Sequence, residues 1–241
     1  MARSRPKERR RKQAGVTLME LLVAIVIFSI VAAMLVGSWI YLNRASVFAM
    51  QDNDSRATAR DALSRMSIEL RDAQPQTLPT ATPTPSASPT WAVLTVASPT
   101  EADFYSAYNQ PGANSNGSGT GMLTRIYLDT SGSSPQKTLL WQRDTNGDGT
   151  FDRTVVLAKN VVNNSIPNTT VTPNTSYTAI FTYGYRDAGG NYLTTDNSSA
   201  SLDLTKIISI QIRLIIDVNL AHTPKYIDLS TTVRPRDAGA N

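Results

Sequence analysis

The hydrophobic pattern of the chain begins with one long apolar run near the N-terminus. Ser29 is the only polar residue between Leu21 and Val36, and the apolar character continues to Leu42 before Asn43. A transmembrane helix needs about 20 predominantly apolar residues, because each residue rises about 1.5 Å along the axis. The run from Leu21 to Leu42 has 22 residues and therefore predicts a membrane-spanning helix.

A second, periodic pattern follows the apolar run. Between Ala59 and Ala73 apolar residues recur at spacings of three and four, with charged residues between them, which is typical of an amphipathic helix. Pro75 is expected to end this helix. We therefore predict one helix from Val16 to about Gln74, with a transmembrane part over residues 16–42 and an amphipathic part over residues 43–74. The apolar positions are Ala59, Leu63, Met66, Leu70 and Ala73, and the charged positions between them are Arg60, Asp61, Arg65, Glu69 and Arg71.

A segment rich in Pro, Thr, Ser and Ala separates the helical pattern from the rest of the chain. Proline has no backbone N–H and a restricted φ angle, so closely spaced prolines prevent a helix and a regular strand ladder. Residues 75–90 are therefore predicted to be an extended linker. Their prolines are Pro75, Pro79, Pro83, Pro85 and Pro89.

Residues 91–241 have the pattern of a β domain. Short segments rich in β-branched and aromatic residues alternate with clusters of Gly, Asn, Ser and Pro, which predicts antiparallel strands joined by turns. One sheet is expected to cover the apolar stripe of the amphipathic helix, which makes the fold class α+β. The predicted strands are Trp91–Ala97, Ala102–Tyr108, Met122–Asp129, Thr138–Arg143, Arg153–Ala158, Tyr177–Tyr185, Ile207–Val218 and Tyr226–Val233.

The seventh predicted strand has the clearest alternation of apolar and polar positions. Its inward set is expected to start at Ile208 and to recur at every second residue to Ile216. Successive side chains of a strand point to opposite faces, so this pattern predicts a half-buried strand. The intervening positions, Ser209, Gln211, Arg213 and Ile215, are expected on the other face.

The positive charge of the chain is concentrated in its first 15 residues. The whole sequence has 23 basic and 19 acidic residues, whereas the part after residue 15 has 16 basic and 18 acidic residues. A basic segment of this kind also occurs in nucleic-acid-binding proteins. Here it immediately precedes a predicted transmembrane helix, where basic residues keep the N-terminus in the cytoplasm. We therefore interpret residues 1–15 as a topogenic leader and expect no nucleic-acid partner.

The junction between leader and apolar run carries a specific motif. Residues 15–20 read GVTLME and place Glu20, an ionisable residue, at the start of the apolar helix. A charged side chain costs about 2.5–3.5 kcal/mol at the centre of a membrane helix, so its presence near such a helix needs a reason. The motif resembles the processing site of type IV prepilins and of the pseudopilins of type II secretion. The resemblance implies that a prepilin peptidase cuts between Gly15 and Val16 and N-methylates Val16. It also implies that Glu20 pairs with the amino group of Val16 in its own or a neighbouring subunit. Val16 departs from the phenylalanine that is usual at this position.

The resemblance also implies a pilin-like fold and a structural role. A large β domain after the helix is most similar to the J-type minor pseudopilin, a subunit of the pseudopilus tip in type II secretion. Minor pilins of type IV pili share these features, so that alternative stays open. The implied partners are the prepilin peptidase, the membrane, and other pilins or pseudopilins bound through the N-terminal helix. The implied location is the inner membrane in a single pass, with the β domain periplasmic or extracellular.

A second motif lies between two predicted strands. Its oxygen-bearing residues match the spacing of the first nine positions of an EF-hand loop, and Gly149 occupies the sixth position. Val155 stands at position twelve, where an EF-hand has a bidentate glutamate, and no helices flank the loop. Two interpretations stay open: a Ca²⁺ site, or a hairpin turn whose acidic residues face water. Besides the pseudopilin and the pilin, a further alternative function is an uncleaved membrane-anchored module that binds calcium or acts in adhesion. Calcium binding by such a module would require the Ca²⁺ site. The candidate ligands are Asp144, Asn146, Asp148, Thr150 and Asp152.

Other chemistry is poorly supported by the sequence. The chain has no cysteine, and its single histidine, His222, lies beside Pro224 in a predicted turn. No nucleophile, base and acid can be combined into a catalytic group. We therefore expect a protein that is not an enzyme and has no cofactor other than the candidate calcium.

Overall fold

The computed structural model describes most of the chain after the leader. The predicted leader, including Gly15, lies outside the described residues, and so do His222 and most of the predicted linker. The described residues are 16–77, 91–106, 121–165, 177–187, 189–196, 202–218 and 225–236.

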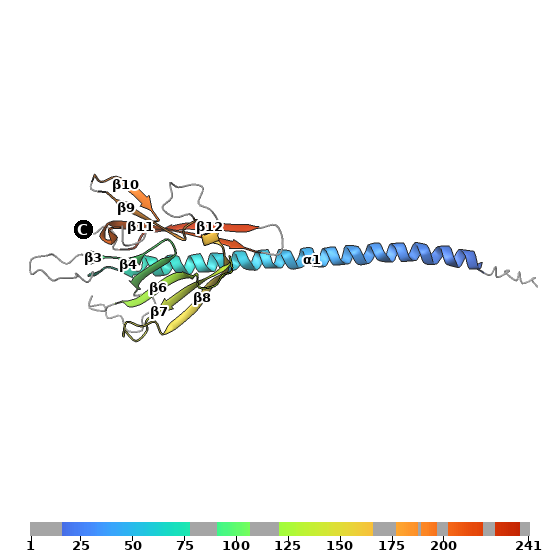
Figure 1. The fold of residues 1–241 in the computed structure, drawn as a ribbon, viewed down its shortest axis with the longest axis horizontal. Coiled ribbons are helices and arrows are strands. Elements are labelled where there is room, and N and C mark those ends of the chain that lie inside the picture. Colours follow the sequence, from blue (N-terminus) through green and yellow to red (C-terminus); the bar gives the residue numbers. More distant parts are fainter. Residues whose placement is uncertain are drawn as a thin grey trace, which may run out of the picture. The chain divides into compact units, whose positions relative to one another are not determined.

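One long helix and a set of β-strands form the fold (Figure 1). The helix, α1, has 54 residues and includes the apolar run and, without interruption, the amphipathic pattern as far as Leu70. The chain divides within α1 into two units, which meet at Met50 and Gln51. The elements are α1 (Leu18–Arg71), β1 (Ala73–Gln74), β2 (Gln76–Thr77), β3 (Trp91–Ala92), β4 (Leu94–Ala97), β5 (Glu101–Ser106), β6 (Met122–Asp129), β7 (Lys137–Arg143), β8 (Arg153–Val161), the 3₁₀ turn η1 (Asn163–Ser165), β9 (Phe181–Arg186), β10 (Tyr192–Thr195), the 3₁₀ turn η2 (Leu204–Lys206), β11 (Ile207–Asp217) and β12 (Tyr226–Val233).

The strands of the second unit are antiparallel, as predicted. In the described residues ten of them form one sheet with the order β1-β5-β6-β7-β8-β11-β9-β10, in which β4 also pairs with β5 and β12 with β11. The remaining two, β2 and β3, pair with each other. Residues at the start of the predicted linker thus pair with residues just after it. This α+β arrangement of a long helix and an antiparallel sheet confirms the predicted fold class.

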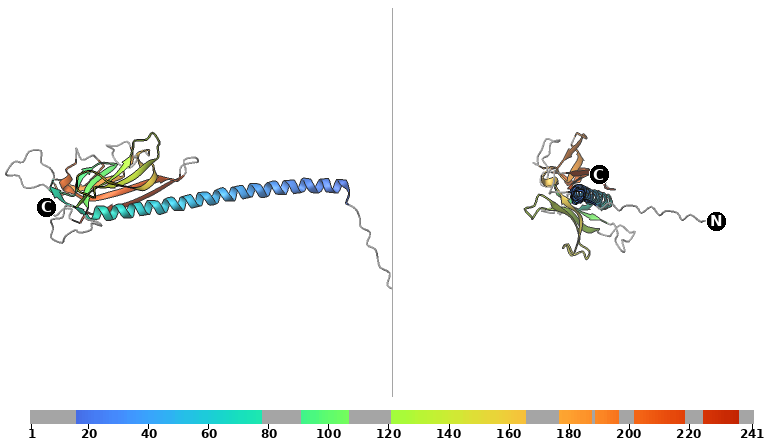
Figure 2. Two further views of the ribbon diagram at one scale, coloured as in Figure 1. Left: turned by 90° about the horizontal axis from the view of Figure 1, so that it is seen from below. Right: turned by 90° about the vertical axis from the view of Figure 1, so that its right-hand side faces the viewer.

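The core of the second unit lies between the sheet and the C-terminal part of α1. Figure 2 shows the sheet curving around these helical turns, with β6–β8 on one side and β9–β12 on the other. All five apolar positions of the predicted stripe are buried, and they belong to the same cluster as the inward residues of the sheet. Burial of apolar area at roughly 25 cal/mol per Å² is therefore what holds the helix on the sheet.

The helix ends at Arg71, three residues before the predicted end. Ala73 and Gln74 instead pair with Ser106 and Tyr105 of β5, so they are extended. Pro75 disfavours the helical region for the residue before it, which explains why the chain leaves the helix early. The backbone N–H of Arg236, after β12, donates to the carbonyl of Arg71 at 3.1 Å and satisfies one orphan group of the helix end.

The alternation of β11 differs from the prediction at both ends. Ile208 is half-buried while Ile207 and Ser209 are buried, because the register with β9 shifts between these two residues. Such an irregularity reverses which face the following side chains occupy. Toward the C-terminal end Ile215 and Asp217 are buried as well, so β11 is covered on both faces there.

Asn163 explains part of this extra coverage. Its Nδ2 donates to the carbonyl of Arg213 at 2.8 Å, and its Oδ1 accepts from the N–H of Ile215 at 2.8 Å. The side chain therefore takes the place of a neighbouring strand beside β11 and satisfies backbone groups that are buried.

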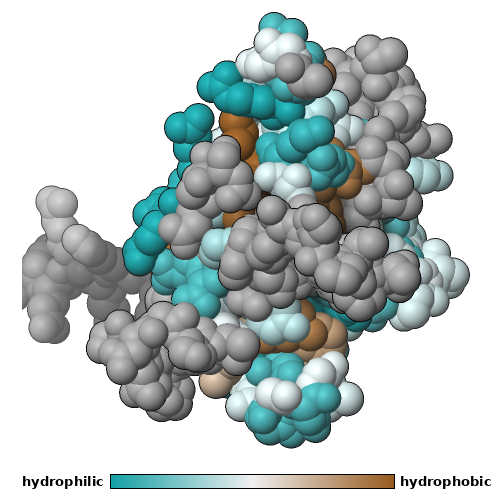
Figure 3. Space-filling model, turned by 90° about the vertical axis from the view of Figure 1, so that its left-hand side faces the viewer, coloured by the Kyte–Doolittle hydropathy of each residue, from teal (hydrophilic) through white to brown (hydrophobic). Residues whose placement is uncertain are grey.

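Several strand boundaries also differ from the prediction. The strand predicted from Tyr177 begins at Phe181, and β8 continues to Val161. The sequence pattern missed β10, a short strand that pairs with β9 and exposes the side chains of Tyr192 and Leu193. Among the coloured residues in Figure 3, hydrophilic ones predominate, and hydrophobic residues are visible in narrow strips between them.

Candidate functional site

The first turn of α1 brings Glu20 next to the start of the described chain. Thr17 precedes the helix, and its Oγ1 accepts a hydrogen bond from the N–H of Glu20 at 3.3 Å. Thr-x-x-Glu is the pattern of a capping box, in which the glutamate stands at the third helical position. Glu20 also places a negative charge at the positive end of the helix dipole. Sequence reasoning missed this local role of Thr17, although the spacing was visible.

The apolar run forms the N-terminal turns of the same helix. Within the described residues, α1 is the helix that is long and apolar enough to cross a membrane, with a mean hydropathy of 2.8 over its most apolar segment, none of which is buried. Ser29, its only polar residue between Leu21 and Val36, donates its hydroxyl to the carbonyl of Ile25 at 2.8 Å. The one polar side chain between Leu21 and Val36 is therefore satisfied within the helix itself.

Comparison with known proteins places a family motif on this helix. Residues 10–36 match the family described as the prokaryotic N-terminal methylation motif. The chain thus carries the N-terminal motif that is characteristic of type IV pilin-like proteins and pseudopilins. That motif implies processing by a prepilin peptidase, assembly with other pilins, and anchoring by a helix that could span a membrane. No curated protein and no solved structure matches the chain.

The candidate calcium loop joins β7 to β8 and is held by its own hydrogen bonds. The buried carboxylate of Asp144 accepts from the N–H of Gly147 through Oδ1 and from the N–H of Gly149 through Oδ2, both at 2.7 Å. Both glycines have positive φ angles, 78° and 85°, which L side chains rarely adopt. These contacts explain why the loop needs glycine at both positions.

The remaining candidate ligands are also engaged within the loop. Oδ1 of Asp148 accepts from the N–H of Thr150 at 2.7 Å, and Oδ1 of Asp152 accepts from the N–H of Thr145 at 3.0 Å. The hydroxyl of Thr150 also donates to Asp148, and the hydroxyl of Thr145 also donates to Asp152. These hydrogen bonds lower the pKa of both aspartates. Oδ1 of Asn146 accepts from the N–H of Asp148. Among the described residues no three Asp, Glu, His or Cys side chains are grouped to hold a metal ion. Calcium binding by this loop stays a prediction.

The structure brings together a second group of residues that sequence reasoning missed. Glu69, expected among the exposed charges of α1, is only 1% exposed and accepts from Ser106 Oγ at 3.0 Å and from Arg143 Nη2 at 2.5 Å. Arg143 is 5% exposed and also donates to Thr124 Oγ1. A signal for this pair was present, since Arg143 follows Leu139 and Trp141 at the two-residue spacing of the buried face of β7.

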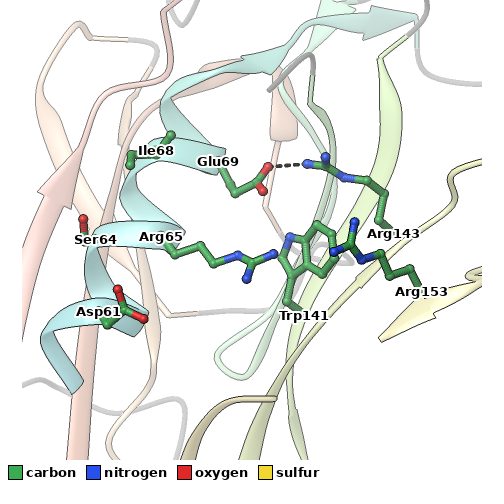
Figure 4. Close-up of a pocket in the computed structure, with 8 residues that line it drawn as sticks. All are labelled: Asp61, Ser64, Arg65, Ile68, Glu69, Trp141, Arg143 and Arg153. Carbon is green, nitrogen blue, oxygen red and sulfur yellow. Dashed lines mark hydrogen bonds and ion pairs between the residues drawn. The ribbon is translucent and has the colours of Figure 1, made fainter. Parts of the chain in front are cut away.

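Trp141 is at the centre of this group, which lines a cavity (Figure 4). Arg65 reaches the indole from α1, while Arg143 and Arg153 reach it from β7 and β8. Their Cζ atoms lie 4.5, 4.8 and 5.8 Å from the ring centroid. Cations over an aromatic face are attracted by its negative quadrupole. The cavity measures about 350 Å³ and is lined by Asp61, Ser64, Arg65, Ile68, Glu69, Trp141, Arg143 and Arg153.

Burial perturbs both members of the Glu69–Arg143 pair. Desolvation of the carboxylate raises the pKa of Glu69 above its ordinary value of 4.5, despite the attraction of Arg143. Desolvation also lowers the pKa of Arg143, and the positive charges of Arg65 and Arg153 act in the same direction. The cavity lining therefore carries three arginines against two acidic residues, the exposed Asp61 and the buried Glu69.

Proposed function

We propose that this protein is a minor pseudopilin, a structural subunit at the tip of a type II secretion pseudopilus. The observation that carries the proposal is the methylation motif at residues 10–36, which runs directly into a 54-residue helix. The C-terminal turns of that helix are built into the core of a large β domain. A subunit of this design inserts its apolar turns among neighbouring helices and presents its β domain for recognition. It needs no catalytic group of its own.

In this proposal Gly15 and Val16 flank the cleavage site, and Val16 becomes the methylated N-terminus. Glu20 then lies one helical turn from the new amino group. In a filament core that excludes water, an unpaired carboxylate carries a large desolvation cost, whereas a carboxylate that meets an ammonium group is compensated. This difference favours the subunit register in which Glu20 contacts the N-terminus of its own chain or of a neighbour.

The first experiment determines the N-terminal residue and the intact mass of the membrane-extracted protein. Cells with an active prepilin peptidase are expected to yield a chain that starts at Val16 and carries one additional methyl group. Cells without the peptidase should yield the uncleaved chain. Retention of the leader in both strains would contradict processing and would leave the β domain as a module tethered by an uncleaved anchor.

A minor pilin of a type IV pilus is the second candidate, because the same N-terminal motif is characteristic of both classes. The two are separated by deletion of the gene. Loss of secreted proteins with intact surface pili supports the pseudopilus, whereas loss of pili with normal secretion supports the pilus.

Calcium binding by the β7–β8 loop is a separate proposal, with Asp144, Asn146, Asp148, Thr150 and Asp152 as ligands. It requires the carboxylates to exchange some of their contacts with loop N–H groups for the ion. If it is correct, Ca²⁺ raises the unfolding temperature of the protein, and the variant Asp148→Asn loses this increase while keeping its fold. An unfolding temperature that Ca²⁺ does not change supports the hairpin interpretation.

A further inference from the structure

We propose that the cavity beside Trp141 is a binding site for a small oxyanion, a compact molecule that carries carboxylate or phosphate groups. The inference does not depend on assembly into a filament, because every lining residue belongs to the unit that begins at Gln51. Three features of the cavity favour such a ligand: its charge, its unpaired donor and its size.

The charge of the lining is unbalanced in favour of a bound anion. The lining has three arginines against two acidic residues, Asp61 and Glu69. The three guanidinium carbons lie within 6 Å of the centroid of one indole ring, and Arg143 is paired with Glu69. Arg65 and Arg153 form no ion pair with any acidic residue in the part of the chain that the structure describes. Each guanidinium carries five N–H donors in a planar fork that matches carboxylate and phosphate oxygens. An anion between these two side chains would relieve their mutual repulsion.

The lining also contains a buried donor without a partner. Nε1 of Trp141 has no hydrogen-bond acceptor within the described residues, although the residue is only 1% exposed. An unsatisfied buried polar group costs about 1–3 kcal/mol, so such groups are rare without a reason. Because this atom is shielded from solvent, an oxyanion would supply the missing acceptor after a neighbouring lining side chain moves aside. A neutral or cationic ligand would leave the arginine charges uncompensated.

The size of the cavity restricts the ligand. About 350 Å³ is near the lower end of the range for small-molecule pockets, roughly 300–1,000 Å³. The three arginine side chains already lie against the indole ring of Trp141, so a large aromatic ligand is not expected to stack on this ring. A phosphate ion or a small polycarboxylate fits both the volume and the donors.

Fluorescence of Trp141 can report binding directly. The chain has three tryptophans, so the variant Trp39→Phe/Trp91→Phe of the full-length, detergent-solubilised protein leaves Trp141 as the sole indole. This protein is titrated with inorganic phosphate, citrate and chloride at constant ionic strength. A saturable response to phosphate identifies phosphoryl chemistry, and one to citrate identifies carboxylate chemistry. Chloride is expected to have no saturable effect.

Charge-removing variants in the same background test the site itself. Arg65→Gln and Arg153→Gln are each expected to raise the half-maximal anion concentration about tenfold, the loss expected for one charge-assisted hydrogen bond. Arg60→Gln is the matched control, because Arg60 is an exposed arginine of the same helix outside the cavity. Thermal unfolding verifies that all three variants are folded. The proposal would be overturned if chloride gave the same fluorescence response as phosphate and citrate, or if no anion gave a response. It would also be overturned if the Arg65 and Arg153 variants kept the half-maximal anion concentration of the parent protein.

Discussion

At the scale of single residues, two glutamates of α1 have opposite environments. Glu20 is exposed at the first turn of α1, where Thr17 contacts its backbone and its carboxylate has no partner within the described residues. Glu69, near the other end of the same helix, is buried and paired with Arg143. A buried ion pair contributes little by itself, but removal of one partner leaves an uncompensated charge. The two glutamates should therefore affect different properties.

Replacement of Arg143 by glutamine is expected to destabilise the second unit by about 3–5 kcal/mol, because Glu69 would remain buried without its partner. Denaturant unfolding of the detergent-solubilised protein measures this change. The double variant Glu69→Gln/Arg143→Gln should recover part of the loss. A single variant as stable as the wild type would show that the pair contributes nothing to the fold.

The raised pKa of Glu69 has a defined consequence for the pH dependence of stability. A carboxyl group whose pKa is higher in the folded state binds protons more tightly there, so its contribution to stability is complete below its ordinary pKa of 4.5 and is lost as the pH rises through the raised value. The wild type should therefore lose more stability than Glu69→Gln as the pH increases above 4.5. Unfolding temperatures of both proteins across this range test the sign. If the unfolding temperatures of the two proteins changed equally with pH, the predicted contribution of Glu69 would be wrong.

At the scale of elements, α1 is stabilised by packing in its last turns and not by its own length. Its residues from Ala59 onward fill the concave side of the sheet, and the sheet in turn needs them to cover its apolar face. Local propensity is a weak determinant for such a helix, since most helical stability in proteins comes from tertiary packing. Asn163 has the corresponding role for β11, because it satisfies backbone groups on the edge opposite β12, between the residues that pair with β9 and those that pair with β8.

Two methionines of α1 provide a matched test of this packing. Met66 is fully buried, whereas Met50 is 68% exposed. Met66→Ala should lower the free energy of unfolding of the β domain by about 2–5 kcal/mol through lost apolar contact and a residual cavity. Met50→Ala should change it by less than about 0.5 kcal/mol. Denaturant unfolding followed by near-ultraviolet circular dichroism measures both. Equal effects would argue against the helix as part of the core.

At the scale of the whole molecule, α1 contributes to two units, and its two parts have different surfaces. Its N-terminal turns present an unbroken apolar surface, and its C-terminal turns are buried in a β domain. This division matches the requirements of a protein that is held in a membrane or filament at one end and folds in water at the other. The proposed role as a pseudopilin uses both parts.

Glu20→Leu should therefore separate assembly from folding. The variant is expected to keep the unfolding temperature of the β domain, because Glu20 lies outside the second unit. It is expected to lose incorporation into sheared filaments, because the amino group of Val16 would have no carboxylate to meet. Arg143→Gln should show the reverse, a destabilised domain with Glu20 intact. Normal incorporation of the Glu20 variant would contradict the proposed role of this residue.

The sequence by itself determined the features that depend on local pattern. The apolar run, the stripe from Ala59 to Ala73 and the strands Met122–Asp129 and Tyr226–Val233 follow from periodicity, which acts between residues close in the chain. The methylation motif is equally local. These features needed no information about distant contacts.

Only the tertiary structure decided which polar residues are buried and which segments lie side by side. Glu69 and Arg143 are 74 residues apart, and their pairing depends on the helix lying across β7. The early end of α1 depends likewise on a distant partner, because Ala73 and Gln74 pair with β5. Burial and ion pairing are properties of spatial neighbours, and spacing along the sequence constrains those neighbours only within one helix or strand. The cavity beside Trp141 therefore depends on the fold, whereas the pilin-like N-terminal motif can be recognised from the sequence alone.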